Sequence, residues 1–308
     1  MKIGSFDTDR AVLIVAEIGN NHEGRFDLAA EMIRRAAECG VRAVKFQTVR
    51  AAQLVRRSEA DRFARLTRFE LSQRQFGELS QLARELGLLF LSTPLSLEAA
   101  TFLEPMVDSY KVASGDNDFF PLLEKIASTG KPVIVSTGAS DVSQVDATVR
   151  FLRGQWESRG TSGDLALLHC VSSYPTPPHE ANLRSIPYLA EKFGCTIGYS
   201  DHTLGTEAVA LAVAAGARII EKHFTLDKHQ SDFRDHQLSA DPEEMTELVN
   251  RVILAHGNGR QDDSVVRGRV ADGHSPFDRR GPRLESRSDD RCGRSQVDSS
   301  RGWFTAGQ

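Results

Sequence analysis

Two short segments each place a histidine close to a carboxylate. The segment SDHTLG contains His202 next to Asp201, and the segment IIEKHFT contains His223 two residues after Glu221. Because side chains two apart in a β-strand share one face, Glu221 and His223 are expected to point the same way. Two imidazoles with nearby carboxylates are typical of a divalent transition-metal site that keeps open positions and acts as a Lewis acid. The segments therefore predict a metal site if they are neighbouring strands.

Two lysines and several hydroxyl groups also lie near the ends of apolar runs. Lys45 lies in AVKFQT and Lys111 in SYKVASG. A single strand lysine is more often an edge residue, and a single strand histidine is more often a core or rim residue. Polar groups at nearly every strand end favour a site instead, and ammonium groups with hydroxyls suit a small phosphorylated, carboxylated ligand. The other polar residues at these ends are Glu17, Gln47, Ser92, Thr93, Ser114, Ser136, Thr137, His169, Ser172, Tyr174 and Ser200.

Two other kinds of site are disfavoured. Ser200, Asp201 and His202 have the residue types of a hydrolase triad, but sequential neighbours on one strand end rarely face one another, and the sequence has no GxSxG turn. It also has neither a GxxxxGK(S/T) loop nor a GxGxxG turn. Nothing in the sequence therefore indicates the binding of nucleotide phosphates.

These residues are spread over a chain that alternates short apolar runs with amphipathic segments. The strand candidates are AVLIVAEIG, RAVKFQT, LLFLSTP, SYKVASG, PVIVSTG, LALLHCV, CTIGYSD and RIIEKHF. Segments such as FDLAAEMIRRAAECG and SQRQFGELSQLARELG carry apolar residues at helical spacing and a closing glycine. Eight such units predict an α/β fold, a (β/α)8 TIM barrel over residues 1–255, with an open doubly wound sheet as the alternative. In a barrel the carboxyl ends of the strands form one mouth, where the polar residues would converge.

Composition narrows the class of protein. The 308 residues are 40% hydrophobic and carry a formal net charge of -4, which gives no signal for nucleic-acid binding. No apolar run is long enough to cross a bilayer, and the start MKIGSFDTDR lacks the build of a secretion signal. The cysteines lack CxxC spacing, which disfavours disulfides and a structural zinc. A cytoplasmic protein without membrane or nucleic-acid partners is expected, and its four cysteines are Cys39, Cys170, Cys195 and Cys292.

Residues 256–308 differ in composition from the preceding part. Arg, Gly, Ser and Asp dominate this segment, lysine is absent, and Leu284 is its only leucine. Such a segment buries too little apolar surface to offset its ordering entropy, so a disordered, low-order tail is predicted. A shifted reading frame in GC-rich coding sequence would also produce this composition.

Motifs along all eight strand candidates resemble one family. The segments AEIGNNHEG, AVKFQT, FLSTPLS, YKVASGDN, PVIVSTG, LLHCVSSYPTP, IGYSDHTLG and EKHFTLD resemble the sialic acid synthase (N-acetylneuraminate synthase) family, in order from about Ile14 to Leu254. The resemblance implies an enzyme that condenses phosphoenolpyruvate with an open-chain N-acetylated hexosamine of the N-acetylmannosamine type. The products are a nine-carbon 2-keto sugar acid and inorganic phosphate. Members of the family also make legionaminic and pseudaminic acids with the same chemistry.

The resemblance also implies a role for individual residues. His202 and His223 match the family's metal ligands, with manganese as the expected ion and magnesium or cobalt as alternatives. Glu17 and Glu221 match the groups that handle water and protons, and which of them is the base stays open. Tyr174 and Asp235 match sugar contacts. The residues that match the phosphoenolpyruvate site are Lys45, Thr93, Lys111, Ser114, Ser136, Ser172 and Ser200.

The sequence departs from the family pattern in two places. The segment before Asp235 reads HQSDFRDH, where the family carries a Gly-Pro ahead of an Asp-His. Family members are homodimers in which a C-terminal antifreeze-like domain reaches into the partner's barrel, and nothing after His256 resembles that domain. An alternative hypothesis is therefore a catalytically impaired barrel that binds phosphoenolpyruvate and metal, with a weakened homodimer.

Overall fold

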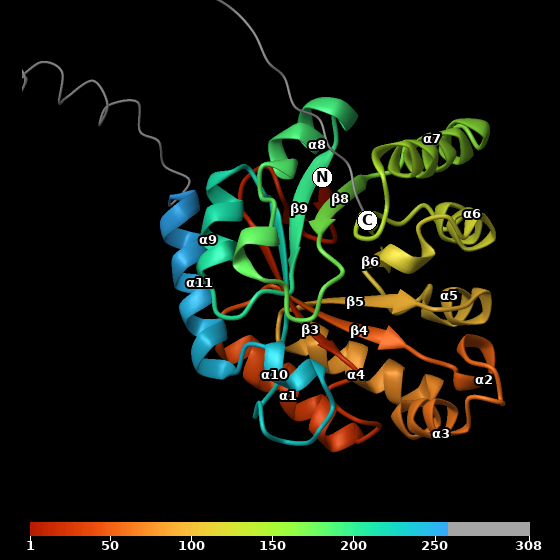
Figure 1. The fold of residues 1–308 in the computed structure, drawn as a ribbon. Helices are drawn as coiled ribbons and strands as arrows, with labels where there is room; N and C mark the ends of the chain where they lie inside the picture. Colours follow the sequence, from red (N-terminus) through yellow and green to blue (C-terminus); the bar gives the residue numbers. More distant parts are fainter. Residues whose placement is uncertain (258–308) are drawn as a thin grey trace, which may run out of the picture. The chain divides into compact units, whose positions relative to one another are not determined.

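The barrel predicted from the sequence is present (Figure 1). The computed structural model describes residues 1–257, and its parallel strands close in the order β10-β3-β4-β5-β6-β7-β8-β9. Strand β10 pairs with both β9 and β3, which rules out the open sheet. The strands are β3 (Leu13–Gly19), β4 (Ala43–Thr48), β5 (Leu89–Pro94), β6 (Ser109–Val112), β7 (Val133–Ser136), β8 (Leu165–Cys170), β9 (Thr196–Asp201) and β10 (Ile219–His223).

Helices alternate with the strands and surround them (Figure 1). Local sequence explains where they begin: Ser72 and Gln75 form a reciprocal capping box at the start of α4. Asp241 caps α11, and Pro242 occupies its first turn. The helices are α1 (Phe26–Glu38), α2 (Ala51–Leu54), α3 (Ala60–Phe69), α4 (Gln73–Glu85), α5 (Leu97–Leu103), α6 (Phe120–Ala127), α7 (Val142–Ser158), α8 (Ser185–Phe193), α9 (Glu207–Ala214), α10 (Asp235–Leu238) and α11 (Pro242–His256), with 3-10 turns η1 (Ser114–Asp116) and η2 (Pro178–Glu180).

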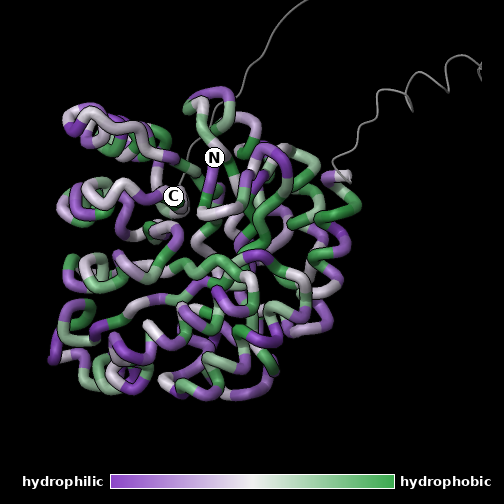
Figure 2. The backbone as a smooth tube through the Cα atoms, turned by 180° about the vertical axis from the view of Figure 1, so that it is seen from behind, coloured by the Kyte–Doolittle hydropathy of each residue, from purple (hydrophilic) through white to green (hydrophobic). Residues whose placement is uncertain are grey.

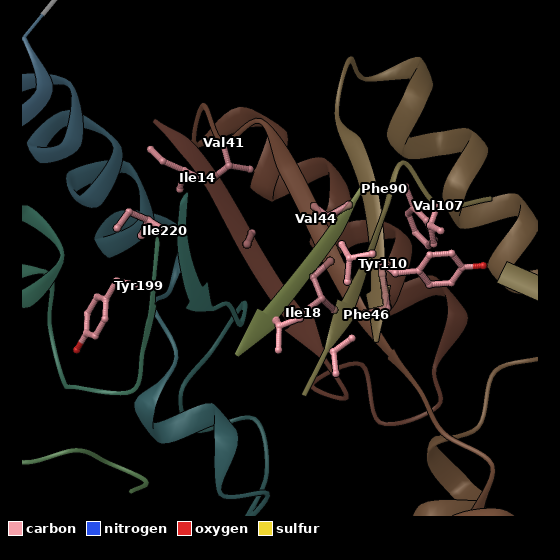
Figure 3. Close-up of a cluster of buried hydrophobic side chains, with 14 of the residues drawn as sticks. Ile14, Ile18, Val41, Val44, Phe46, Phe90, Val107, Tyr110, Tyr199 and Ile220 are labelled. Atoms are coloured by element: carbon pink, nitrogen blue, oxygen red, sulfur yellow. The ribbon is translucent and has the colours of Figure 1, made fainter. Parts of the chain in front are cut away.

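The larger apolar core lies between the strands and the helices (Figure 3). Outward-facing side chains of the strands, such as Ile14, Phe46 and Phe90, pack there against the inner faces of the helices. The rings of Phe46 and Phe90 are stacked with centroids 5.5 Å apart. Along the helices, hydrophilic and hydrophobic residues alternate in the tube view (Figure 2), as expected for helices that cover a barrel with one face.

A smaller apolar cluster fills part of the barrel interior. On β3, Leu13 and Val15 belong to this inner cluster, whereas Ile14 belongs to the outer core. The strand therefore alternates between two environments, and Glu17 continues the inward-facing series beyond Val15. The interior is thus apolar in its deeper layers and becomes polar toward the carboxyl ends of the strands.

A two-stranded hairpin, β1 (Lys2–Ile3) and β2 (Phe6–Asp7), covers the amino-terminal end of the barrel. Ile3 is fully buried in the inner apolar cluster. The backbone N–H of Lys2 donates to the carboxylate of Asp164, the residue before β8, at 3.4 Å. The hairpin therefore closes the end of the barrel that lies opposite the polar mouth.

The described residues test two of the expectations drawn from composition, those on the cysteines and on membrane-spanning helices. Cys39, Cys170 and Cys195 are free thiols, and Cys292 lies outside the described residues. Within residues 1–257, no helix is both long enough and apolar enough to cross a membrane. The tail predicted for residues 256–308 lies, apart from its first two residues, outside the described part of the chain.

Candidate active site

Side chains from all eight strands meet in a cavity of about 230 Å³ at the carboxyl end of the barrel. All the predicted site residues except Asp235 line this cavity. They are Glu17, Lys45, Thr93, Lys111, Ser114, Ser136, Ser172, Tyr174, Ser200, His202, Glu221 and His223. The convergence follows from the fold, because the inward-facing series of each strand ends at the same mouth.

Two lysines and two glutamates form a buried charge network in the cavity. Lys45 Nζ lies 2.8 Å from Glu17 Oε2 and 3.7 Å from Glu221 Oε2. Lys111 Nζ lies 3.5 Å from Glu221 Oε1. All four side chains are less than 9% exposed. Each charged group lies next to a group of opposite charge, which offsets the cost of burying it. Both lysines are buried, so the interpretation of them as edge residues is wrong.

The two glutamates are in different electrostatic states. Burial raises the pKa of Glu221, but Lys111 and Lys45 outweigh burial and lower this pKa to about 2. For Glu17, burial is the larger effect and raises the pKa above its ordinary value, in spite of Lys45. Glu221 is therefore ionised at neutral pH, and Glu17 is the carboxyl group that accepts a proton more readily.

The loop after β3 holds Glu17 in place. Gln47 Nε2 donates a hydrogen bond of 3.0 Å to Glu17 Oε1, and Asn20 Nδ2 donates to Gln47 Oε1 at 2.9 Å. Gly19 has a φ of +54°, and a Cβ at this position would lie 3.2 Å from Glu17 Oε1. The sequence placed Gln47 at a strand end without a role, and the structure identifies it as the residue that orients Glu17.

A small cradle of hydroxyl groups lies beside Lys111. A Cβ at Gly138 would lie 2.6 Å from Ser172 Oγ and 2.8 Å from Ser114 Oγ, so the glycine leaves a space between these hydroxyls. Ser136 Oγ is buried and has no hydrogen-bond partner among the described residues. These groups are suited to a small anion with several acceptor oxygens. Sequence reasoning gave Gly138 no role, although it is the glycine of the strand-end segment STG.

The two imidazoles are neutral and face the same cavity. Their ring centroids are 5.7 Å apart. His202 Nδ1 lies 2.8 Å from the carbonyl oxygen of Val171, so Nδ1–H donates there and Nε2 carries the lone pair. His223 Nδ1 is buried without a hydrogen-bond partner among residues 1–257. Burial lowers the pKa of both histidines to about 4, and the neutral imidazole is the form that binds metals.

The donor set fits a metal with several open positions. In the described part of the chain, no group of three His, Cys, Asp or Glu side chains is arranged to hold a metal ion. His202 and His223 would therefore supply two ligands, and the others would come from substrate and water. The buried Nδ1 of His223, which has no hydrogen-bond partner among residues 1–257, fits a role for this histidine as a metal ligand.

Tyr174 marks the outer rim of the cavity. Its ring centroid lies 4.1 Å from that of His202, and the guanidinium carbon of Arg234 lies 4.8 Å from the centroid of the Tyr174 ring. Asp235, the first residue of α10, is mostly buried and does not line the cavity; its Oδ1 lies 3.4 Å from Arg234 Nε. The prediction that Asp235 contacts a sugar stays a prediction.

Four polar residues at strand ends do not line the cavity: Ser92, Thr137, His169 and Asp201. His169 Nε2 lies 2.7 Å from the carbonyl oxygen of Ala181. Ser92 Oγ lies 2.7 Å from Thr48 Oγ1. Asp201 pairs with Lys222 instead. Each is an immediate sequence neighbour of a site-lining residue, and strand alternation turns it to the opposite face. Their inclusion among the mouth residues was wrong.

Comparison with known proteins identifies the family. Residues 32–260 match the NeuB family. The chain belongs to the NeuB family. An uncharacterized protein of Methanocaldococcus jannaschii is 46% identical over 242 residues, covering 78% of this chain and 70% of that protein. The N,N'-diacetyllegionaminic acid synthase of Legionella pneumophila is 37% identical over 272 residues, covering 82% and 76% of the two chains.

A solved structure of the NeuB type has the same fold. The N-acetylneuraminic acid (sialic acid) synthetase of Leptospira borgpetersenii serovar Hardjo-bovis, in complex with citrate, matches with a TM-score of 0.79 and 31% sequence identity. The match covers 89% of this chain and 96% of that structure. The resemblance drawn from the eight motifs is confirmed. Named relatives in the NeuB family are synthases of sialic-acid-type sugars, which supports an enzyme.

Proposed function

We propose that this chain condenses phosphoenolpyruvate with an open-chain N-acetylated hexosamine of the N-acetylmannosamine type. The products are a nine-carbon 2-keto sugar acid and inorganic phosphate. The observation that carries this proposal is one cavity with two buried lysines, a cradle of hydroxyl groups and two neutral imidazoles. The similarity to an N,N'-diacetyllegionaminic acid synthase and to a sialic acid synthetase supports the same reaction type.

Phosphoenolpyruvate fits the deeper half of the cavity. Its phosphate and carboxylate would take hydrogen bonds from Lys111, Ser136 and the hydroxyls around Gly138. The Lys111–Glu221 distance of 3.5 Å is longer than a strong charge-assisted hydrogen bond, so Lys111 is available to an anionic ligand. The other proposed contacts to phosphoenolpyruvate are Lys45, Thr93, Ser114, Ser172 and Ser200.

The sugar aldehyde fits the outer half, near the imidazoles. His202 and His223 would hold a divalent metal, with manganese as the proposed ion and magnesium or cobalt as alternatives. When bound, such an ion supplies Lewis-acid stabilisation of the negative charge that develops on the aldehyde oxygen. Tyr174 at the rim and Asp235 beside it are proposed to contact the sugar.

The two glutamates divide the handling of charge and protons. In the proposed reaction, C3 of phosphoenolpyruvate bonds to the aldehyde carbon, water adds at C2, and the C2–O bond to phosphate breaks. The raised pKa of Glu17 suits it to take the proton from this water. Glu221 stays ionised, accepts a hydrogen bond of 3.0 Å from Ser200 and orients both lysines. We therefore assign the base role to Glu17.

Two alternatives keep the same cavity. The identity to a legionaminic acid synthase favours a 2,4-diacetamido hexose as the acceptor in a legionaminate-type or pseudaminate-type reaction. The other alternative is an impaired barrel that binds phosphoenolpyruvate and metal without turnover. We also propose a homodimer, as the family resemblance implies, and a cytoplasmic location, as the cysteine spacing suggests.

Phosphate release by the purified chain tests the proposal. The assay contains phosphoenolpyruvate and Mn²⁺ with either N-acetylmannosamine or a 2,4-diacetamido hexose, with and without a chelator. Chelator-sensitive release with one sugar supports the synthase and identifies the acceptor. Binding of phosphoenolpyruvate without release from either sugar supports the impaired barrel. Failure to bind phosphoenolpyruvate overturns both.

A further inference from the structure

An ion pair is buried on the outer face of the two strands that carry the histidines. Asp201 on β9 and Lys222 on β10 are direct cross-strand partners. Lys222 Nζ lies 2.7 Å from Asp201 Oδ2, and both side chains are at most 1% exposed. On the inner face of the same two strands, Ser200 and Glu221 are also direct partners, joined by a hydrogen bond of 3.0 Å. Neither Asp201 nor Lys222 lines the active-site cavity.

The pair fixes the backbone on both sides of His202. Asp201 Oδ1 accepts hydrogen bonds from the backbone N–H of Thr203 at 2.9 Å and from its hydroxyl at 2.8 Å. The Tyr199 hydroxyl donates to the same oxygen at 3.0 Å. Lys222 Nζ also donates to the carbonyl oxygen of Thr203. Asp201 and Thr203, which flank His202, are therefore both bonded to Lys222, the residue directly before His223.

Packing alone does not explain an ion pair at this position. The neighbours of Lys222 on the same outer face of the chain, Ile220 and Phe224, are fully buried and apolar. Replacing a buried ion pair by well-packed apolar residues is often neutral or stabilising, because the desolvation of two charges offsets their attraction. What apolar residues would not reproduce is the set of directional bonds to Thr203.

We infer that the Asp201–Lys222 pair is a positioning device that sets the relative placement of the His202 and His223 imidazoles. The cross-strand pair fixes the register of the two strands behind the site, and the Thr203 bonds fix the bend that turns His202 into the cavity. This inference rests on the proposed metal-binding role of the two histidines. Residues that orient metal ligands from behind typically change metal affinity 10- to 100-fold when they are replaced.

The test compares Mn²⁺ binding, phosphoenolpyruvate binding and thermal unfolding of the metal-free chain. The main variant combines Asp201→Leu with Lys222→Met, which removes both charges and fills the space of the two side chains with apolar groups. We expect its Mn²⁺ affinity to fall at least about tenfold, with phosphoenolpyruvate affinity and unfolding temperature close to those of the wild type. The matched control combines Lys228→Met with Glu244→Leu, an ion pair away from the cavity, and should leave Mn²⁺ affinity unchanged.

An unchanged Mn²⁺ affinity in the Asp201/Lys222 double variant overturns the inference. If that variant does not fold, Asp201→Asn decides, since it keeps the shape of the side chain and removes the charge that faces Lys222. Unchanged Mn²⁺ affinity in a folded Asp201→Asn chain likewise overturns the inference, and weaker binding supports it. A wild-type chain that binds phosphoenolpyruvate but no Mn²⁺ overturns both this inference and the proposed metal site, and the wild-type measurement alone reveals that case.

Discussion

Lys45 and Glu17 form a buried ion pair of 2.8 Å between neighbouring strands, and the same lysine lies 3.7 Å from Glu221. One ammonium group therefore interacts with two carboxylates whose pKa values are shifted in opposite directions: the pKa of Glu17 is raised and that of Glu221 is lowered. This arrangement separates a carboxyl group that is easily protonated from one that stays ionised. The stability of the apo site and its acid–base chemistry thus depend on the same lysine.

Replacing Lys45 by Met should destabilise the chain strongly at pH 7 to 8. The substitution leaves Glu17 and Glu221 with one cation fewer in a buried site, which costs about 3–5 kcal/mol of unfolding free energy. The loss should shrink as the pH falls, because the raised pKa of Glu17 lets it take up a proton and lose its charge. Denaturant unfolding measures both effects. Lys125→Met, which removes a partly exposed pair with Glu104, is the control and should cost less than about 1 kcal/mol; equal losses in both variants would refute the prediction.

Replacing Lys111 by Ala should weaken phosphoenolpyruvate binding more than sugar binding. A charge-assisted hydrogen bond contributes about 1.5–3 kcal/mol, so the dissociation constant for phosphoenolpyruvate should rise by a factor of about 10 to 150. Calorimetric titration gives this constant, and steady-state kinetics give the KM for the sugar. An equal effect on both ligands counts against placing Lys111 at the anion.

Replacing His223 by Ala should abolish metal-dependent turnover and leave the barrel folded. The reason is that, within residues 1–257, His202 and His223 are the only histidines that line the cavity, so the loss of one removes half of the proposed protein ligands. Mn²⁺ titration measures the loss of metal binding, and circular dichroism shows whether the barrel is still folded. His179→Ala, at an exposed histidine, is the matched control. Undiminished Mn²⁺ binding by the His223 variant removes this histidine from the metal site.

Replacing Gly138 by Ala should close the hydroxyl cradle. The new Cβ would lie 2.6 Å from Ser172 Oγ and 2.8 Å from Ser114 Oγ, in the space that the phosphate is proposed to use. We expect phosphoenolpyruvate affinity to fall at least tenfold, equivalent to about 1.4 kcal/mol. Gly154→Ala on α7 is the control, because nothing lies within 4 Å of its Cβ. It should leave affinity unchanged and stabilise the helix by up to about 1 kcal/mol; the same affinity in both variants contradicts the cradle.

The metal-free chain should lose stability through buried histidines as the pH falls from about 6.5 to 4. Burial lowers the pKa of His22 to about 4 from the ordinary 6.5, so the unfolded chain takes up this proton first, and folding is penalised as the pH drops. His22 is 1% exposed, and its Nδ1 accepts from the backbone N–H of Gly24, a bond that protonation would break. The full penalty for this group is roughly 3 kcal/mol.

The variant His22→Gln isolates this contribution. Gln keeps an acceptor for the Gly24 N–H but does not titrate, so the stability of the variant should fall less steeply with acid. Between pH 6 and 4.5 the difference in slope should approach about 1.4 kcal/mol per pH unit. Urea unfolding at several pH values measures the slope, and parallel curves for the two chains contradict the assignment. His202, His223 and Glu17 are common to both chains and cancel in the difference.

The sequence predicts the barrel well because the strands have two recognisable features, an apolar early part and an alternating late part. Runs such as AVLIVAEIG are apolar on both faces in their early part, as expected for strands covered by helices and filled inside. Their late part alternates, and Glu17 and Glu221 with His223 fall on the inner face as period-two spacing requires. Barrel closure itself depends on β10 pairing with β3, which no local pattern encodes.

The rest of the site could not be predicted because it depends on register and on loops from different strands. Alternation places His169 and Asp201 opposite Cys170 and Ser200, but which of the two faces points into the barrel is known only from the folded structure. The cradle combines Gly138, Ser114 and Ser172, which follow three different strands. Lys222 resembles a solvent-facing residue in sequence, and its partner is identified only by the pairing of β9 with β10.

The amino-terminal hairpin closes one end of the barrel, so the cavity opens at the carboxyl end of the strands. With Ile3 inserted into the apolar cluster at the far end, ligands enter and leave past Tyr174 at the mouth. In the proposed arrangement, a ligand held by Lys111 and the hydroxyl cradle would lie behind a ligand held beside Tyr174. With these placements, the inner ligand would bind first and would be released only after the outer one. The hairpin that closes one end of the barrel would thus lead to ordered binding at the other end. The first ligand would be retained until the second has left or reacted.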